Sequence, residues 1–119
     1  MIVDSSAILA IAFQEPEAIR FASAIVQAPK RQISNVNWLE TMMLIESRAG
    51  IPAADDTLLI LAQLEVEPLT FDAAHMHEAH EAWRRFGKGR HPASLNLGDC
   101  CAYSASKTEQ AVAFQGQRF

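Results

Sequence analysis

Three acidic residues lie next to apolar or turn-forming residues, where a charged side chain is not expected without a specific role. They are Asp4, Glu40 and Asp99. Asp4 follows an apolar start of three residues, and Asp99 follows a glycine in the stretch LNLGDCC. Glu40 has apolar residues at three of its helical neighbours, Val36, Met43 and Leu44. Carboxylate oxygens suit Mg²⁺ or Mn²⁺, which keep several waters and also bind substrate phosphates. Three such side chains would form a hard-cation site if the fold brought them together.

Each of these acids also has an ordinary structural interpretation. Asp4 and Asp99 are well placed to cap the helices that follow them, and Glu40 can be a boundary residue whose carboxylate reaches water. Capping and metal binding are compatible, because a helix amino terminus stabilises the ionised form that a metal requires. Spacing along the chain leaves both interpretations open.

The elements that must position these acids alternate along the chain. Of the 119 residues, 50% are hydrophobic, which predicts a single compact domain over residues 1–119. We expect short strands at 1–3, 32–34, 65–71 and 111–114. We expect helices at 5–13, 15–27, 36–48, 55–64, from Asp72 to about 86, and 99–107. Either Ser34 or Asn35 would cap the helix at 36–48, and Asp72 would cap the helix that follows it.

This alternation predicts an α/β fold with a short central parallel sheet of about four strands and helices on both faces. Pro68 favours an edge position for its strand, and the apolar spacing in 36–48 indicates a largely buried helix that ends at Gly50. In an open parallel sheet, functional groups gather beyond the carboxyl ends of the strands. Asp4 occupies such a position.

Charge and cysteine usage limit the function classes. A net charge of −4 argues against a nucleic-acid binder that works by overall positive field, although a local basic patch remains possible. Cys100 and Cys101 are neighbours and cannot close a stabilising loop, and we expect small core residues in a reducing, cytoplasmic setting. The start MIVDSS and the short apolar runs predict neither export nor membrane insertion.

A basic cluster precedes Asp99 and is the candidate contact for an RNA backbone. It surrounds two aromatic residues, Trp83 and Phe86. The same run is also compatible with a plain solvated face. Its cationic members are Arg84, Arg85, Lys88 and Arg90.

Two other chemistries fit the sequence less well. On a helix, His75 would face Ala79 and the core while His77 and His80 face water, and this spacing matches no standard zinc pattern. Phosphatases of the haloacid-dehalogenase type need a second aspartate two residues after the first, where this chain has Ser6.

With these residues in view, the sequence resembles the PIN-domain ribonucleases, and most closely the VapC-type toxins of type II toxin–antitoxin pairs. Three stretches carry the resemblance, in family order and over nearly the whole chain: MIVDSSAILAI, NWLETMMLIESR and FGKGRHPASLNLGDCCAYSASK. The last stretch is long and specific.

The resemblance implies a three-layer PIN fold and a metal-dependent endoribonuclease. It places Asp4, Glu40 and Asp99 around Mg²⁺ or Mn²⁺, with Ser6 in the outer shell of the metal. Such a cation lowers the pKa of a bound water and stabilises the leaving oxygen of an RNA phosphodiester. The resemblance also implies a homodimer and neutralisation by a VapB-like antitoxin.

The C-terminal end departs from the family pattern, in which a further acid precedes the final phenylalanine. Here Arg118 stands at that position, and we expect a C-terminal end shorter than usual. A guanidinium there would pair with Asp99 or leave one ligand missing. The alternative function is therefore a catalytically impaired PIN domain that acts only by binding antitoxin or RNA.

Overall fold

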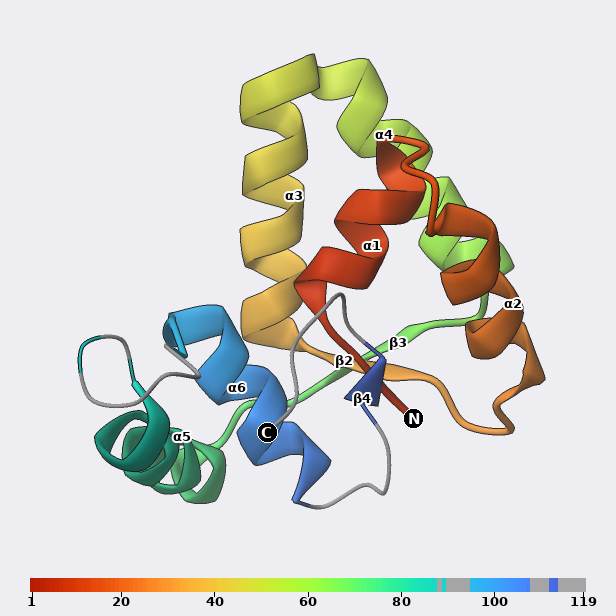
Figure 1. Ribbon diagram of the computed structural model, residues 1–119. Coiled ribbons are helices and arrows are strands. Elements are labelled where there is room, and N and C mark those ends of the chain that lie inside the picture. Colours follow the sequence, from red (N-terminus) through yellow and green to blue (C-terminus); the bar gives the residue numbers. More distant parts are fainter. Residues whose placement is uncertain (88, 90–94, 108–111, 114–119) are drawn as a thin grey trace.

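The computed structural model describes residues 1–87, 89, 95–107 and 112–113. Within them, four short strands alternate with six helices (Figure 1). The strands are β1 (Ile2–Val3), β2 (Gln32–Ser34), β3 (Glu67–Leu69) and β4 (Val112–Ala113). The helices are α1 (Ser5–Ala12), α2 (Ala18–Gln27), α3 (Asn35–Ala49), α4 (Ile51–Gln63), α5 (Ala73–Phe86) and α6 (Leu97–Ser106).

All strand pairs are parallel, and the strand order is β3-β2-β1-β4. The chain moves outward from β1 to β3 on one side and then returns to place β4 on the other side of β1. The order therefore reverses at β1, which is where open parallel sheets place their functional groups. Asp4 directly follows this strand.

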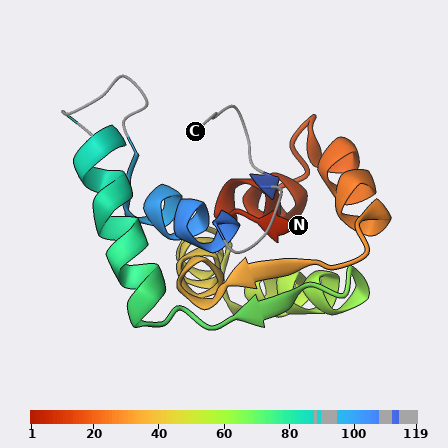
Figure 2. The same ribbon diagram turned by 90° about the horizontal axis from the view of Figure 1, so that it is seen from below.

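The helices surround the sheet in pairs. In both views α2 and α5 lie on opposite sides of the molecule, with the sheet between them (Figure 1, Figure 2). Helix α3 packs against α4, α1 and α6, and α5 packs against α6. The main core joins the sheet to α1, α2 and α4, and its buried members are Val3, Ala7, Ile8, Ala10, Phe21, Ile25, Ile33, Leu61 and Val66. No helix in the described part of the chain is long and apolar enough to cross a membrane.

Several local predictions are confirmed. The α/β fold with a four-stranded parallel sheet is present, and β3, which contains Pro68, is an edge strand. Ser34 caps α3, Asp72 caps α5, and α3 ends at Gly50 with φ of 90°, a conformation that glycine adopts without strain. Cys100 and Cys101 are buried free thiols.

Three helix starts were predicted at the wrong residues. Helix α2 begins at Ala18 rather than at residue 15. Helix α4 begins at Ile51 rather than near Asp55, because Gly50 ends α3 and Pro52 occupies the first turn, where a missing N–H costs nothing. Helix α6 begins at Leu97 with Asn96 as its cap, so Asp99 lies in the first turn and does not cap the helix. In each case an acidic residue was taken as the start signal of the helix. Helices α4 and α6 begin before that residue, and α2 begins after it.

The prediction that α3 is largely buried was also wrong. Leu39 and Met43 are 60% and 63% exposed, and the buried residues of this helix are Asn37, Thr41 and Ile45. The inward face of α3 is thus partly polar, and it points toward α1 and α6.

The two faces of α4 differ enough to be tested with one residue type. Leu61 is 1% exposed in the main core, whereas Leu59 on the same helix is 63% exposed. We expect Leu61→Ala to lower the free energy of unfolding by about 2–5 kcal/mol, because it removes buried methyl groups and leaves a cavity. Leu59→Ala should change it by about 0.5 kcal/mol or less. Urea unfolding of both variants measures the difference, and equal losses would contradict the assigned core.

Candidate active site

A cavity of about 170 Å³ lies beyond the carboxyl end of β1, and Asp4, Glu40 and Asp99 all line it. The three acids come from different parts of the chain: the residue before α1, the middle of α3 and the first turn of α6. The other lining residues are Ser5, Ser6, Leu9, Asn37, Leu44, Asn96 and Gly98.

Asp4 is the most buried of the three acids, with 4% of its surface exposed. It is the N-cap of α1, as predicted, and its Oδ1 accepts hydrogen bonds from the backbone N–H and the hydroxyl of Ser6. Ser6, predicted in the outer shell, therefore holds the carboxylate that lies deepest.

The surroundings of Asp4 oppose its ionisation in the metal-free protein. The pKa of this carboxyl is raised from 3.8 to about 6, mainly by burial and to a smaller extent by the negative charges of Asp99 and Glu40. The hydrogen bonds from Ser6 act in the opposite direction. A cation in the cavity would relieve both unfavourable contributions.

Glu40 reaches the cavity from α3 and is held by Ser5, the first residue of α1. Its Oε1 accepts a hydrogen bond of 3.0 Å from the Ser5 hydroxyl. Gly98 lies so close that a Cβ atom there would stand 2.6 Å from Oε1. The carboxylate of Glu40 occupies the space that a side chain at position 98 would need.

Asp99 is held by a reciprocal capping arrangement at the start of α6. Its Oδ2 accepts from the backbone N–H of Asn96 at 3.1 Å, and the Asn96 side chain accepts from the backbone N–H of Asp99 at 2.9 Å. This is a capping box in which Asn96 is the cap and Asp99 is the third helical residue.

The three carboxylates share one feature that bears on metal binding. In each, one oxygen accepts a hydrogen bond from a nearby serine or backbone N–H, and the other accepts none from the described residues. The cavity has room for several waters beside the carboxylates. An all-oxygen donor set with this much room fits a hydrated Mg²⁺ or Mn²⁺, which typically binds one or two carboxylates and keeps its waters.

The three carboxylates nevertheless do not converge closely enough to coordinate one ion directly. Across residues 1–87, 89, 95–107 and 112–113, no group of three or more His, Cys, Asp or Glu side chains is arranged to hold a metal ion. Mutual repulsion of carboxylates favours such separation when no cation is present. The cavity therefore fits a water-bridged ion better than a tight protein cage.

The predicted RNA contacts lie elsewhere. Arg84 and Arg85 occupy the last turn of α5, where cations favour the helix dipole, and neither lines the acidic cavity. The Arg85 guanidinium stands 5.0 Å from the ring centroid of Phe86. Lys88, Arg90 and Arg118 lie outside the described residues, so the predictions for them stay predictions.

Four cavity residues were not identified from the sequence: Ser5, Asn37, Asn96 and Gly98. For Asn96, the signal was the pair Asn-x-x-Asp, which is typical of a capping box. For Asn37, it was an amide one helical turn before Glu40. Ser5 and Gly98 carry no such signal, because their roles depend on contacts between α1, α3 and α6.

The histidines behave as the sequence indicates. His75 is buried and its Nδ1 accepts from the backbone N–H of Asp72 at the start of α5, while His77 and His80 are exposed. His75 thus supports the helix cap, in line with its core position rather than a zinc site.

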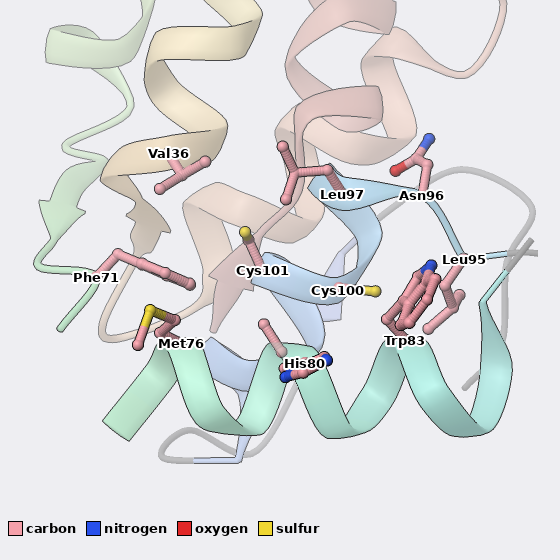
Figure 3. Close-up of a pocket in the computed structure, with 11 residues that line it drawn as sticks. Val36, Phe71, Met76, His80, Trp83, Leu95, Asn96, Leu97, Cys100 and Cys101 are labelled. Carbon is pink, nitrogen blue, oxygen red and sulfur yellow. The ribbon is translucent and has the colours of Figure 1, made fainter. Parts of the chain in front are cut away.

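A second, larger cavity of about 520 Å³ lies between α5, α6 and the start of α3 (Figure 3). Its walls are almost entirely apolar, and Asn96 lines both this cavity and the acidic one. Three of its lining side chains, Met76, Trp83 and Leu97, are large, apolar and exposed. Such a surface commonly marks an interaction site.

The raised pKa of Asp4 predicts how the stability of the metal-free protein depends on pH. Between pH 3.8 and about 6, the unfolded chain releases this proton before the folded protein does. The folded state therefore loses stability as pH rises through this window, by about 3 kcal/mol in total. We expect Asp4→Asn to raise the melting temperature without metal at pH 7 and to have little effect near pH 4.

Asp56→Asn, at an exposed position on α4, is the matched control and should change neither value. Thermal melts in a chelator across pH 4–8 measure both variants. A wild type and an Asp4→Asn variant with the same pH dependence would contradict the assigned burial of this charge.

Comparison with known proteins agrees with the fold. The PIN domain family matches residues 1–119. A ribonuclease VapC of Mycolicibacterium smegmatis is 40% identical, with 100% of this chain and 93% of that protein covered. Ribonuclease VapC30 of Mycobacterium tuberculosis is 38% identical, with coverage of 100% and 92%.

The crystal structure of Mycobacterium tuberculosis VapC20, described as a sarcin-ricin loop cleaving toxin, superposes with a TM-score of 0.75 at 22% identity. The superposition covers 97% of this chain and 89% of that one, and it supports the fold. A parallel sheet ordered β3-β2-β1-β4, full-length family matching and relatives near 40% identity together lead to one conclusion. The chain belongs to the PIN-domain family, among the VapC ribonucleases.

Proposed function

We propose that this chain is an endoribonuclease that depends on Mg²⁺ or Mn²⁺ and hydrolyses RNA phosphodiester bonds. One observation carries the proposal: three carboxylates from separate elements line one cavity, each with one oxygen hydrogen-bonded and the other without a partner among the described residues. The names of its relatives, which are ribonucleases, support the reaction class.

Asp4, Glu40 and Asp99 would hold the cation, and the cation would supply an activated water and stabilise charge on the phosphate and leaving oxygens. The chain's own residues supply orientation. Ser6 holds Asp4, Ser5 holds Glu40 and Asn96 holds Asp99, so each carboxylate is fixed by a hydrogen bond to one of its oxygens. No side-chain nucleophile is needed.

The proposed partners follow from the family. They are an RNA substrate, a cognate VapB-like antitoxin and a second copy of the chain, in the cytoplasm. Arg84 and Arg85 remain the proposed contacts for the RNA backbone, because an acidic protein needs local positive charge to meet phosphates. Both are exposed at the end of α5.

The alternative, a domain that only binds antitoxin or RNA, has less support. It rests on Arg118, which lies outside the described residues, and the compared relatives are named ribonucleases. The three acids that the cavity needs are all present.

The proposal predicts cleavage of a mixed RNA pool only when Mg²⁺ or Mn²⁺ is present. Asp4→Asn, Glu40→Gln and Asp99→Asn should each lower the rate about 100-fold or more. A bound metal supplies several kcal/mol of transition-state stabilisation, and about 1.4 kcal/mol corresponds to tenfold. Gel analysis of labelled RNA at matched protein concentration measures the rates.

Asp4→Asn also separates lost activity from lost folding, because this variant should be more stable than the wild type without metal at pH 7. Asp56→Asn is the matched control and should cleave normally. Metal-independent cleavage, or full activity in the three acid variants, would contradict the proposal. A folded wild type that binds RNA or antitoxin without cleaving it would favour the binding-only alternative.

The apolar cavity between α5 and α6 supports the proposed homodimer (Figure 3). Burial of Met76, Trp83 and Leu97 against a second copy would remove a large exposed apolar surface from water. We expect Met76→Glu to shift the protein from dimer to monomer in light scattering after gel filtration.

Ile19→Glu on α2 is the control, because Ile19 is also exposed but lies outside this cavity. It should leave the dimer intact. A dimer that survives Met76→Glu would exclude this cavity as the dimer contact, and a monomeric wild type would overturn the homodimer itself.

A further inference from the structure

A chain of hydrogen bonds connects three helices behind the acidic cavity, and its centre is the Asn37 side chain. The Asn37 Nδ2 donates to the Gly98 carbonyl of α6 at 3.0 Å and to the Ser5 hydroxyl of α1 at 3.2 Å. Ser5 in turn lies 3.0 Å from Glu40 Oε1. Asn37 and Ser5 are 1% and 8% exposed, so water does not compete for these groups.

The chemistry of the donors gives this chain a single direction. A backbone carbonyl only accepts, so the Asn37 amide must turn its NH₂ group toward Gly98. Both hydrogens of that group are then used, the second by Ser5. Since Ser5 accepts from Asn37, its one hydrogen is left to donate, and two acceptors lie within reach: Glu40 Oε1 at 3.0 Å and the Asn37 carbonyl at 3.3 Å. The carboxylate is the nearer and the charged acceptor, and the Asn37 carbonyl already accepts from the Thr41 hydroxyl at 2.7 Å, so the Ser5 hydrogen goes to Glu40.

The same three residues also surround the Glu40 carboxylate sterically. Glu40 Oε1 fills the space beside Gly98 where a Cβ atom would stand. The Asn37 side chain of α3 donates to the Gly98 carbonyl and so keeps Gly98 close to Glu40. A hydrogen bond on one side and a close backbone on the other restrict the rotation of the carboxylate.

We propose that Ser5 and Asn37 are positioning residues that orient Glu40, so that its Oε1 is held by the protein and its Oε2 is left for the divalent cation. This inference rests on the proposed metal-dependent function. Hydrogen-bond partners of metal-binding side chains typically matter for affinity almost as much as the ligands themselves. Neither residue would touch the substrate.

Mn²⁺ affinity, measured by titration calorimetry, tests the role of Ser5 without relying on activity. Ser5→Ala removes the hydroxyl that holds Glu40 and should weaken Mn²⁺ binding about 10- to 100-fold. Ser5→Thr keeps a hydroxyl at this position and should restore most of the affinity. Rescue by a hydroxyl is a result that a purely structural role of Ser5 does not predict.

Ser104→Ala is the matched control. Ser104 is a fully buried serine of α6 whose hydroxyl also donates one hydrogen bond, to the Cys101 carbonyl, and it does not line the acidic cavity. Its variant should bind Mn²⁺ as the wild type does. Equal affinity of Ser5→Ala and wild type, or an equal loss in Ser104→Ala, would overturn the positioning role.

Asn37→Ala tests the other half of the chain of hydrogen bonds, with a thermal melt to establish that the variant is folded. If Asn37 acts on Glu40 through Ser5, its effect on Mn²⁺ affinity should be smaller in the Ser5→Ala background than in the wild type. Strictly additive effects would overturn the relay. A wild type that binds no Mn²⁺ would instead remove the proposed function, and this inference with it.

Discussion

Burial of like charge in one small cavity is the constraint on which the rest of this structure depends. Asp4 is almost fully buried, and the charges of Asp99 and Glu40 add to the cost of ionising it. An uncharged residue at position 4 would remove this cost, and the cation proposed above would offset it. The surrounding residues are best understood as the means of keeping three carboxylates together.

The hydrogen bonds that hold the carboxylates differ from one acid to the next. The N-terminus of α1 and Ser6 hold Asp4, the capping box with Asn96 holds Asp99, and Ser5 holds Glu40 from the neighbouring helix. Each device satisfies one carboxylate oxygen and leaves the other without a partner in the described part of the chain. The same hydrogen bonds would therefore also orient the three carboxylates for the proposed cation.

The sheet explains why the cavity lies where it does. Because the strand order reverses at β1, the helices that follow β1 and β2 and the one that precedes β4 all reach the same end of the sheet. Helix α3 turns a partly polar face toward these helices, on which Asn37 and Thr41 are buried. Asn37 uses that face to connect α1 to α6, so the packing of the three helices and the position of Glu40 are not independent.

The sequence by itself determined the alternation of strands and helices, the parallel sheet with Pro68 at its edge, and the caps at Asp4 and Asp72, because periodicity and capping are properties of neighbouring residues. It also singled out the three acids. Only the tertiary structure decided that these acids line one cavity and that α3 turns Asn37 inward and exposes Leu39. These outcomes depend on contacts between residues 30 to 60 positions apart, and spacing along a chain carries no direct record of such contacts.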